Sequence, residues 1–242
     1  MGGLRPWPAP DELHARRSLR GPRRPRGVVS RTRIKICGLT RETDVAAAVE
    51  AGADAVGFVL WGGSARHVDA ARARQLAQSL PPFVVPVLLF VNASAAEVAA
   101  GIAAVPQALL QFHGDETPAQ CEAARRPYLR AARMGERFDL LDFAARFRSA
   151  QALLLDAHVE GFGGAGRVFD WSRVPPSVPC PVVLSGGLSP ANVTDGVLRV
   201  RPYAVDVSSG VESARGIKDA ALMRRFCDAV READARLADA GA

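Results

Sequence analysis

Arg33-Ile34-Lys35-Ile36-Cys37-Gly38 is a short, largely apolar stretch that stops at a cysteine and a glycine, and it opens the regular part of the chain. Side chains alternate along a strand, so Lys35 and Cys37 point to the same face. The thiol is therefore expected at the carboxyl end of the first strand, which is where α/β proteins build active sites. Two interpretations stand at this point: a functional thiol, or a buried cysteine that packs as a small hydrophobe.

Strand and helix signals alternate without interruption after residue 32. Runs such as Leu153-Leu154-Leu155 are typical of parallel strands covered by helices. Eight strands and about eight helices predict an α/β fold, a single (β/α)8 TIM barrel, with an open doubly wound sheet as the alternative. The predicted strands are 33–37, 54–60, 83–91, 108–112, 128–133, 152–156, 181–184 and 203–207. The predicted helices are 41–51, 69–79, 94–104, 117–126, 136–148, 190–199 and 218–237, with a weak one at 170–178.

Charge is distributed unevenly along the 242 residues. The formal net charge is +6, but nine arginines and two acids give residues 1–33 a charge of +7 and leave −1 for the rest. A near-neutral body makes nucleic acid an unexpected partner. Residues 1–30 are rich in Pro, Arg and Gly, without the apolar segment of a secretory signal. We expect a disordered basic extension here (a transit peptide, a basic tail or an upstream start) and a catalytic barrel over 31–242.

The spacing of the cysteines and histidines indicates whether the chain has a metal site and in which redox compartment it folds. The histidines show no metal-ligand spacing such as H-E-x-x-H. The cysteines lack C-x-x-C spacing, which argues against a zinc site and a disulfide framework and fits a reducing cytoplasm. No segment approaches the ~18 apolar residues needed to span a bilayer, so no membrane association is expected. The four cysteines are Cys37, Cys121, Cys180 and Cys227.

Small residues follow each of the last three predicted strands. Gly161 to Gly166 follows strand six, Ser185-Gly186-Gly187-Leu188 follows strand seven, and Ser208-Ser209-Gly210-Val211 follows strand eight. Glycine permits the left-handed backbone with which N–H groups converge on an anion. Any one of these segments could be an ordinary tight turn. The three together predict a phosphorylated small-molecule ligand, since the turns after strands seven and eight commonly bind phosphate in such barrels.

Four polar residues are candidates for the rest of the site. Asp156 ends a buried strand, where partial burial would raise its pKa and suit it to acid–base work, although it could simply cap the following loop. Asp206 is expected inside the barrel, as a ligand contact or as a partner of Lys35. Arg66 suits a carboxylate, or is a solvated surface arginine. Three interpretations are open for His113: it contacts the substrate, it shapes the pocket, or it only ends strand four. The other acidic positions are interpreted as solvated faces and caps: Glu42, Asp44, Glu97 and Glu116.

Several longer motifs carry a resemblance to a known family. They are Arg33–Gly38, Ala51–Phe58, Phe90–Asn92, Gln111–Gly114, Leu155-Asp156 with Gly163–Gly166 and Phe169–Trp171, Leu184–Val193, and Val205–Glu212. Together they resemble the phosphoribosylanthranilate isomerase family of tryptophan biosynthesis. The resemblance covers about residues 33–235, and the combination of motifs is highly specific.

The resemblance implies a (β/α)8 barrel that performs an Amadori rearrangement of N-(5-phosphoribosyl)anthranilate without a metal or organic cofactor. It implies that Asp156 is the general acid that opens the sugar ring and that Cys37 is the general base that removes the C2 proton. Positive charge from Lys35 would lower the pKa of that thiol. Arg66 aligns with the arginine that meets the anthranilate carboxylate. The phosphate grip aligns with Gly186, Gly187, Ser208, Ser209 and Gly210.

Lys35, His113 and Asp206 are expected as further substrate contacts, and the chain is expected to be a monomer or a homodimer. The sister isomerase of histidine biosynthesis is the second candidate. That enzyme typically uses two aspartates, so Cys37 argues against it. A non-catalytic phosphate-binding barrel is a third candidate, and the joint presence of Cys37, Asp156 and Arg66 argues against it.

Overall fold

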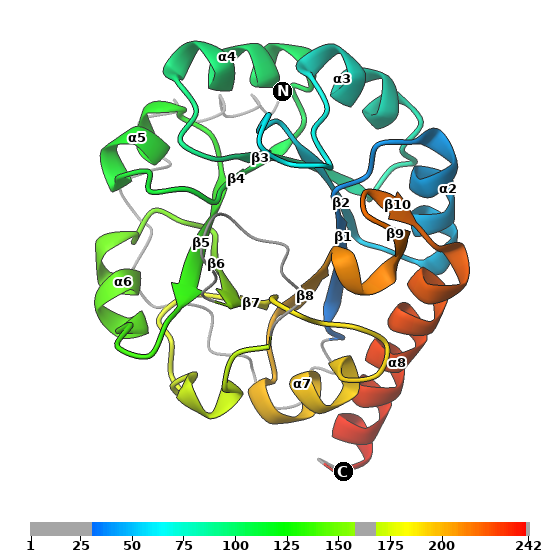
Figure 1. Ribbon diagram of the computed structural model, residues 1–242. Coiled ribbons are helices and arrows are strands. Elements are labelled where there is room, and N and C mark those ends of the chain that lie inside the picture. The colour runs from blue at the N-terminus through cyan, green and yellow to red at the C-terminus, as the bar shows by residue number, and fades with distance from the viewer. Residues whose placement is uncertain (1–30, 158–167, 241–242) are drawn as a thin grey trace, which may run out of the picture.

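The computed structural model describes residues 31–157 and 168–240, which form a closed barrel of eight parallel strands (Figure 1). Each strand pairs with the next one along the chain, and β8 pairs with β1 to close the sheet. The predicted barrel is confirmed, and the alternative of an open sheet is wrong. The strands are β1 (Arg33–Cys37), β2 (Ala55–Val59), β3 (Val85–Phe90), β4 (Leu109–Phe112), β5 (Tyr128–Met134), β6 (Ala152–Ala157), β7 (Val182–Leu184) and β8 (Ala204–Val207).

Helices surround the barrel on its outside (Figure 1). They are α2 (Glu42–Ala51), α3 (Ala70–Gln78), α4 (Ala95–Ala104), α5 (Pro118–Ala123), α6 (Leu140–Arg146), α7 (Val193–Val200) and α8 (Ala220–Asp239). Within the described residues between β6 and β7, the weak helix expected at 170–178 is a single 3-10 turn, η1 (Trp171–Arg173). The predicted extension at 1–30 and the Gly-rich segment at 161–166 lie outside the described residues.

Local capping chemistry explains where several helices begin. The side chains of Ser94 and Thr117 each accept a hydrogen bond from the backbone N–H three residues further on. In return, the side-chain oxygens of Glu97 and Gln120 accept from the backbone N–H of the cap residue. Such reciprocal boxes satisfy N–H groups that the first helical turn leaves without partners. Asp219 caps α8 by accepting from the N–H of Leu222, so the last helix begins after residue 219 and not at 218 as predicted.

The strands separate two apolar layers, because successive side chains point to opposite faces. In β6, Leu153 and Leu155 pack into the main core between the sheet and the helices. Leu154 belongs to a second cluster inside the barrel, and the alternation puts Asp156 on that inner face. The two isoleucines of β1 also join the outer core, which leaves Lys35 and Cys37 facing inward. Each fully buried leucine stabilises the fold by roughly 1.5–3 kcal/mol.

A short hairpin follows β8, and the sequence pattern did not predict it. After the 3-10 turn η2 (Ser209–Val211), β9 (Glu212–Ala214) pairs antiparallel with β10 (Ile217–Lys218). Figure 1 shows this hairpin between the barrel end and α2. Strands of two and three residues are too short for a periodic apolar pattern, which is why Lys218 was assigned to the last helix.

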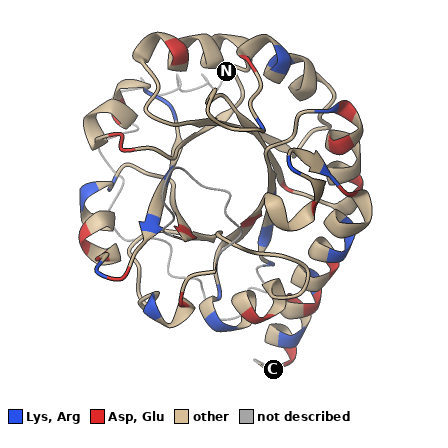
Figure 2. Ribbon diagram, viewed as in Figure 1, with Lys and Arg blue, Asp and Glu red and all other residues tan. Residues whose placement is uncertain are grey.

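Charged residues of both signs alternate over the outer helices (Figure 2). This distribution agrees with the near-neutral charge expected for the chain after residue 33. In the part of the chain that the structure describes, no helix is both long enough and apolar enough to cross a membrane.

Candidate active site

Lys35 and Asp206 form an ion pair inside the barrel. The two residues are register partners where β1 pairs with β8, and Lys35 Nζ lies 2.7 Å from Asp206 Oδ1. The hydroxyl of Ser185 donates to the other carboxylate oxygen at 3.2 Å. The predicted Lys35–Asp206 partnership is confirmed, and Asp206 thereby keeps Lys35 charged: although burial disfavours the ammonium, this carboxylate and Cys37 raise the pKa of Lys35.

Cys37 is buried at the carboxyl end of β1, beside this ion pair. Burial raises the pKa of the thiol, while the charge of Lys35 and its hydrogen bond act in the opposite direction. Lys35 therefore acts in the predicted direction, but burial outweighs it. Space for the sulfur comes from Gly57 on the adjacent strand, because a Cβ there would lie 2.6 Å from Cys37 Sγ.

Asp156 is joined to two residues of β4 and its following turn by a chain of hydrogen bonds. His113 Nε2 lies 3.0 Å from Asp156 Oδ2, and His113 Nδ1 lies 3.0 Å from Gln111 Nε2. The other oxygen of Asp156 accepts from the backbone N–H of Ala157 at 2.9 Å. All three side chains are buried. His113 therefore does more than end a strand, and Gln111, which had no predicted role, supports it.

Gln111 and Asp156 contact the two ring nitrogens of His113, so the orientation of the Gln111 amide is linked to where the imidazole carries its proton. In the orientation described, the amide nitrogen donates to Nδ1, so Nε2 carries the hydrogen and donates to Asp156. The amide oxygen of Gln111 has no hydrogen-bond partner among the described residues. Rotating the amide would give that oxygen to an Nδ1–H and let Nε2 accept a proton from a neutral Asp156 carboxyl. The imidazole is neutral in both arrangements, and the second holds one proton more than the first, on the carboxyl of Asp156.

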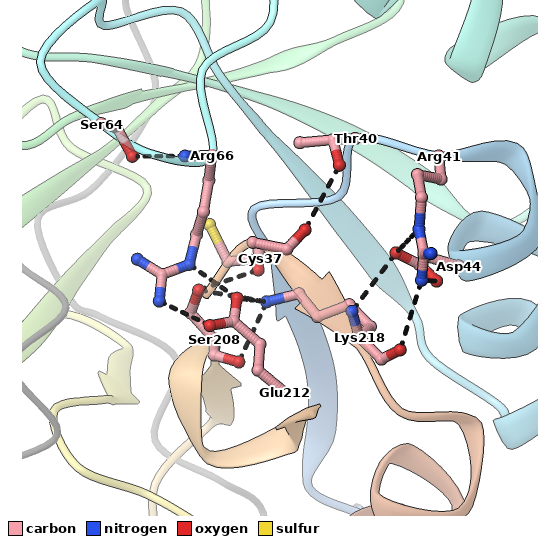
Figure 3. A network of polar contacts seen from close by, with 10 residues as sticks. Cys37, Thr40, Arg41, Asp44, Ser64, Arg66, Ser208, Glu212 and Lys218 are labelled. Carbon is pink, nitrogen blue, oxygen red and sulfur yellow. Dashed lines mark hydrogen bonds and ion pairs between the residues drawn. The ribbon is translucent and has the colours of Figure 1, made fainter. Parts of the chain in front are cut away.

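Arg66 is buried, so the interpretation as a solvated surface arginine is wrong. Its Nε and Nη2 donate to the two carboxylate oxygens of Glu212 at 2.7 and 2.8 Å (Figure 3). Gly38 lies beneath this side chain with φ +79°, and a Cβ at Gly38 would come within 2.4 Å of Arg66 Cδ. The glycine after Cys37 thus lets the arginine from the β2–α3 loop lie close to the end of β1.

Glu212 and Lys218 are site residues that the sequence analysis missed. Lys218 Nζ donates to Glu212 Oε1 at 2.8 Å and to the backbone oxygen of Ser208 at 2.9 Å. The Ser208 hydroxyl in turn donates to the backbone oxygen of Cys37 at 3.0 Å. The sequence did contain a signal for Glu212, since this residue ends the family motif Val205–Glu212. Lys218 had none, because its partners come from the hairpin fold.

The turns after β7 and β8 lie against each other and against Asp156. Gly186 and Gly187 have φ +76° and +65°, the left-handed region that glycine favours. A Cβ at Gly186 would come within 2.8 Å of Asp156 Oδ1, and one at Gly210 within 1.9 Å of the Leu188 backbone oxygen. The structure thus brings the predicted phosphate-binding turns together, and their occupancy by phosphate stays a prediction.

Two acidic residues interpreted as solvated are buried, which corrects that expectation. Glu116 accepts from the backbone N–H groups of Asn92 and Gly114 at 2.7 and 2.8 Å, and so fastens the loops after β3 and β4. Asp44 forms an ion pair with Arg41. Backbone partners distant in sequence leave no local signal. The remaining two acids of that group are exposed as predicted: Glu42 and Glu97.

All four cysteines lie among the described residues and are free. Across residues 31–157 and 168–240, no group of three or more His, Cys, Asp or Glu side chains is arranged to hold a metal ion. The titratable residues at the barrel end form three groups through hydrogen bonds and ion pairs: Lys35 with Asp206, His113 with Asp156, and Arg66 with Glu212 and Lys218.

A closed (β/α)8 barrel with a thiol, a histidine-bound carboxyl and an arginine at the carboxyl ends of its strands has the architecture of a barrel enzyme. The model of the family described as N-(5'phosphoribosyl)anthranilate (PRA) isomerase matches residues 34–229. The chain belongs to this isomerase family, and the resemblance stated from the motifs is confirmed.

Relatives agree along most of the chain. The N-(5'-phosphoribosyl)anthranilate isomerase of Methylibium petroleiphilum is 73% identical over 208 residues, covering 86% of this chain and 98% of that relative. The isomerase of Leptothrix cholodnii is 71% identical over 211 residues, covering 87% of this chain and 96% of that relative. Among solved structures, the phosphoribosyl anthranilate isomerase of Thermotoga maritima has a TM-score of 0.77 and 38% identity, over 83% of this chain and 99% of its own.

A second solved isomerase carries a ligand. It was determined in complex with reduced 1-(o-carboxyphenylamino)-1-deoxyribulose 5-phosphate, and it has a TM-score of 0.74 with 36% identity, over 83% of this chain and 99% of its own. That molecule contains a phosphate and an aromatic carboxylate.

Proposed function

We propose that this protein converts N-(5'-phosphoribosyl)anthranilate to 1-(2-carboxyphenylamino)-1-deoxyribulose 5-phosphate by an Amadori rearrangement, as a step of tryptophan biosynthesis. The family match and the ligand of the solved relative support this substrate. One observation carries the proposal: an ammonium-backed thiol, Cys37 with Lys35, and a histidine-backed carboxyl, Asp156 with His113, stand at the same end of one barrel.

Asp156 is the general acid. Opening the furanose ring requires a proton on the ring oxygen, and a buried carboxyl can supply it. The carboxylate left behind is stabilised by the His113 ring N–H and by the backbone N–H of Ala157. As the C1–O bond breaks, the nitrogen lone pair forms the C=N bond of a protonated Schiff base.

Cys37 is the general base. The protonated Schiff base acidifies the C2–H bond, and the thiolate takes that proton. The C2–H electron pair forms the C1=C2 bond and the C=N π pair moves to the nitrogen, which gives an enolamine. The enolamine then tautomerises to the ketone. Burial makes the thiolate scarce in the free protein, since it raises the pKa of Cys37. The positive charges of Lys35 and of the Schiff base act in the opposite direction.

The remaining residues hold the substrate. Arg66 binds the anthranilate carboxylate, because a guanidinium fork matches a carboxylate. The turns after β7 and β8 bind the phosphate through Gly186, Gly187, Ser208, Ser209 and Gly210. Polar contacts to the sugar come from Lys35, His113 and Asp206.

Two variants test the assignments of acid and base. Cys37→Ser and Asp156→Asn should each lower kcat by about 10²–10⁴-fold, the usual contribution of a positioned acid or base. Both should bind the reduced product with unchanged affinity, measured by calorimetry. Cys180→Ser is the matched control, since that thiol lies outside the site, and it should keep full activity. Full turnover by either site variant would contradict the role assigned to it.

Complementation separates the candidate functions. Rescue of a strain that lacks this isomerase distinguishes an enzyme from a non-catalytic phosphate-binding barrel. Assay of the purified protein with the ribonucleotide of histidine biosynthesis distinguishes the sister isomerase. We expect rescue in the first experiment and preference for the anthranilate substrate in the second.

The partner predictions have one point of comparison. A phosphoribosylanthranilate isomerase of Thermotoga maritima is dimeric, and its monomeric forms have been solved with a TM-score of 0.74 to this chain. We expect this chain to be a monomer or a homodimer in the cytoplasm, without a nucleic-acid partner. Size-exclusion chromatography with light scattering measures the oligomeric state.

A further inference from the structure

Arg66 uses only one edge of its guanidinium within the described part of the chain. A guanidinium has five N–H groups in one plane. Nε and one N–H of Nη2 donate to Glu212, while Nη1 has no hydrogen-bond partner among the described residues. Nη1 and the second N–H of Nη2 form the adjacent edge at the tip of the side chain, which shares Nη2 with the edge that Glu212 occupies. That edge matches a further carboxylate in the same bidentate geometry.

Glu212 fixes the orientation of this free edge before any ligand arrives. An unrestrained arginine side chain loses rotamer entropy when it is immobilised. The two bonds from Glu212, together with the close packing over Gly38, hold Arg66 in one geometry. A ligand that binds a side chain already held in place does not lose this entropy again.

Lys218 fixes Glu212 in turn and connects it to the turn after β8 (Figure 3). Its ammonium donates to Glu212 Oε1 at 2.8 Å, to the Ser208 backbone oxygen at 2.9 Å and to the Ser208 hydroxyl at 3.2 Å. These three bonds match the three N–H groups of an ammonium. One buried lysine thus joins the arginine that meets a carboxylate to the turn that meets a phosphate.

The strand that carries Lys218 is held from outside the barrel by α2 (Figure 3). The Lys218 backbone N–H donates to Asp44 Oδ2 at 3.3 Å, and its backbone oxygen accepts from Arg41 Nη2 at 3.5 Å. Asp44 and Arg41 are themselves an ion pair. The hairpin is therefore anchored on α2 and on the residue that caps it.

The charge of this group favours an anion at the free edge. The group contains two cations and one anion, so its formal charge is +1. The exposed fractions of the side chains are only 11% for Arg66, 0% for Lys218 and 6% for Glu212. A buried charge without compensation is costly. A substrate carboxylate at the free edge of Arg66 would bring the group to neutrality.

From these contacts we infer that Glu212 is a positioning residue for substrate recognition: it presents the free edge of Arg66 to the substrate carboxylate, and Lys218 couples that edge to the phosphate-binding turn. The inference rests on the proposed function, in which Arg66 binds this carboxylate. Glu212 itself touches no reacting atom.

The test compares two ligands on each variant. One is the reduced product, and the other is the same molecule with an unsubstituted phenyl ring in place of the carboxyphenyl ring. Calorimetry gives the ratio of the two affinities, which isolates the contribution of the carboxylate. The wild type should favour the carboxylate by about 10- to 100-fold, as expected for charge-assisted bonds. Arg66→Ala should bring the ratio close to one, which sets the lower limit.

Glu212→Gln should reduce the ratio to about threefold, because Arg66 then loses its charged anchor. The affinity for the phenyl ligand, which reports phosphate binding, should stay within about twofold. In assays, KM for the anthranilate substrate should rise while kcat changes little, the pattern of lost uniform binding. Glu42→Gln is the control, since Glu42 also accepts two bonds from one arginine, Arg72, on the outer surface, and it should leave the ratio unchanged.

Two outcomes would overturn the inference. An unchanged ratio in Glu212→Gln would mean that Arg66 needs no anchor, and an increased ratio would mean that Glu212 competes with the substrate for Arg66. If Glu212→Gln unfolds because Lys218 is left unpaired, the double variant Glu212→Gln/Lys218→Met removes both charges and must also show the reduced ratio. Absence of rearrangement by the wild type would refute the proposed function; normal turnover with an unchanged ratio would refute only this inference.

Discussion

Lys35 and Asp206 join the first and last strands of the barrel through a buried ion pair, with Nζ and Oδ1 2.7 Å apart. Their side chains are 5% and 6% exposed. The pair lies where β8 meets β1 to close the sheet, and it borders the Cys37 thiol. The same contact thus bears on both the stability of the barrel and the chemistry of its end.

Breaking this pair on one side should destabilise the fold. Lys35→Met leaves the Asp206 carboxylate buried without its cation and should lower the free energy of unfolding by about 3–5 kcal/mol. The double variant Lys35→Met/Asp206→Leu should recover most of that loss. Urea unfolding measures both. Arg236→Met, which removes an exposed pair on α8, is the control and should cost less than about 1 kcal/mol. A similar cost for Lys35→Met would contradict the prediction.

The pH dependence of the reaction should follow the Cys37 thiol. The thiolate is the active form of the base, so kcat/KM should rise with pH. Because burial raises the pKa of Cys37, the midpoint should lie above the ~8.5 of a free cysteine. Lys35→Met should move the midpoint further up, since Lys35 lowers that pKa and Asp206 raises it. Profiles from pH 6 to 10 decide this, and a midpoint that falls in Lys35→Met would refute the assignment of Cys37 as the base.

Gln111 should affect catalysis without touching the substrate. Gln111→Leu removes the partner of His113 Nδ1, so the imidazole no longer holds one orientation against Asp156. We expect kcat to fall about 10-fold with KM unchanged, which corresponds to about one hydrogen bond. Steady-state kinetics measure the change, and nitrogen-15 NMR of the His113 ring reports its protonation. Gln78→Leu, on the exposed end of α3, is the control. An unchanged kcat with a normal His113 spectrum would exclude this role.

Gly57 should be required for the position of the thiol. A methyl group in Gly57→Ala would lie 2.6 Å from Cys37 Sγ and must displace it, whereas Gly62→Ala, with no atom within 4 Å, is a matched control on the same side of the barrel. A displacement of about 1 Å can lower the rate about 10²-fold. We expect a loss of that order in kcat for Gly57→Ala and none for Gly62→Ala, measured by steady-state kinetics. Equal activity of the two variants would count against Cys37 as the base.

The barrel could be predicted from the chain because its signals are local and repeated. Eight apolar strands alternate with capped helices, and alternation along β1 already put Lys35 and Cys37 on one face. The Lys35–Asp206 pair was one of two interpretations of Asp206, since a charged residue in an apolar strand needs either a buried partner or a ligand. The predicted starts of the helices differ from the observed ones by a few residues, because the cap residue sets the start, as Asp219 does for the last helix.

The hydrogen-bonded groups around the site could not be predicted in the same way. Gln111 follows no charge or spacing rule, and its role comes from the rotation that puts its amide against His113. Glu116 and Asp44 are acidic positions near helices that the fold buries against backbone N–H groups distant in sequence. Contacts of this kind depend on proximity in the folded chain, and they leave no periodic pattern in a single sequence.

The chain alone was enough to predict the barrel and to place Lys35 and Cys37 on one face at the end of the first strand, because strand alternation and the order of strands fix which side chains share a face and an edge. The choice of Cys37, Asp156 and Arg66 as site residues came from the resemblance of the longer motifs to the isomerase family. How those residues are held could be seen only in the folded chain: Cys37 is buried beside Lys35, Asp156 is held by His113, and Arg66 is held by Glu212 and Lys218. The reason is physical, since burial and hydrogen-bond geometry arise only when segments distant in the chain pack together.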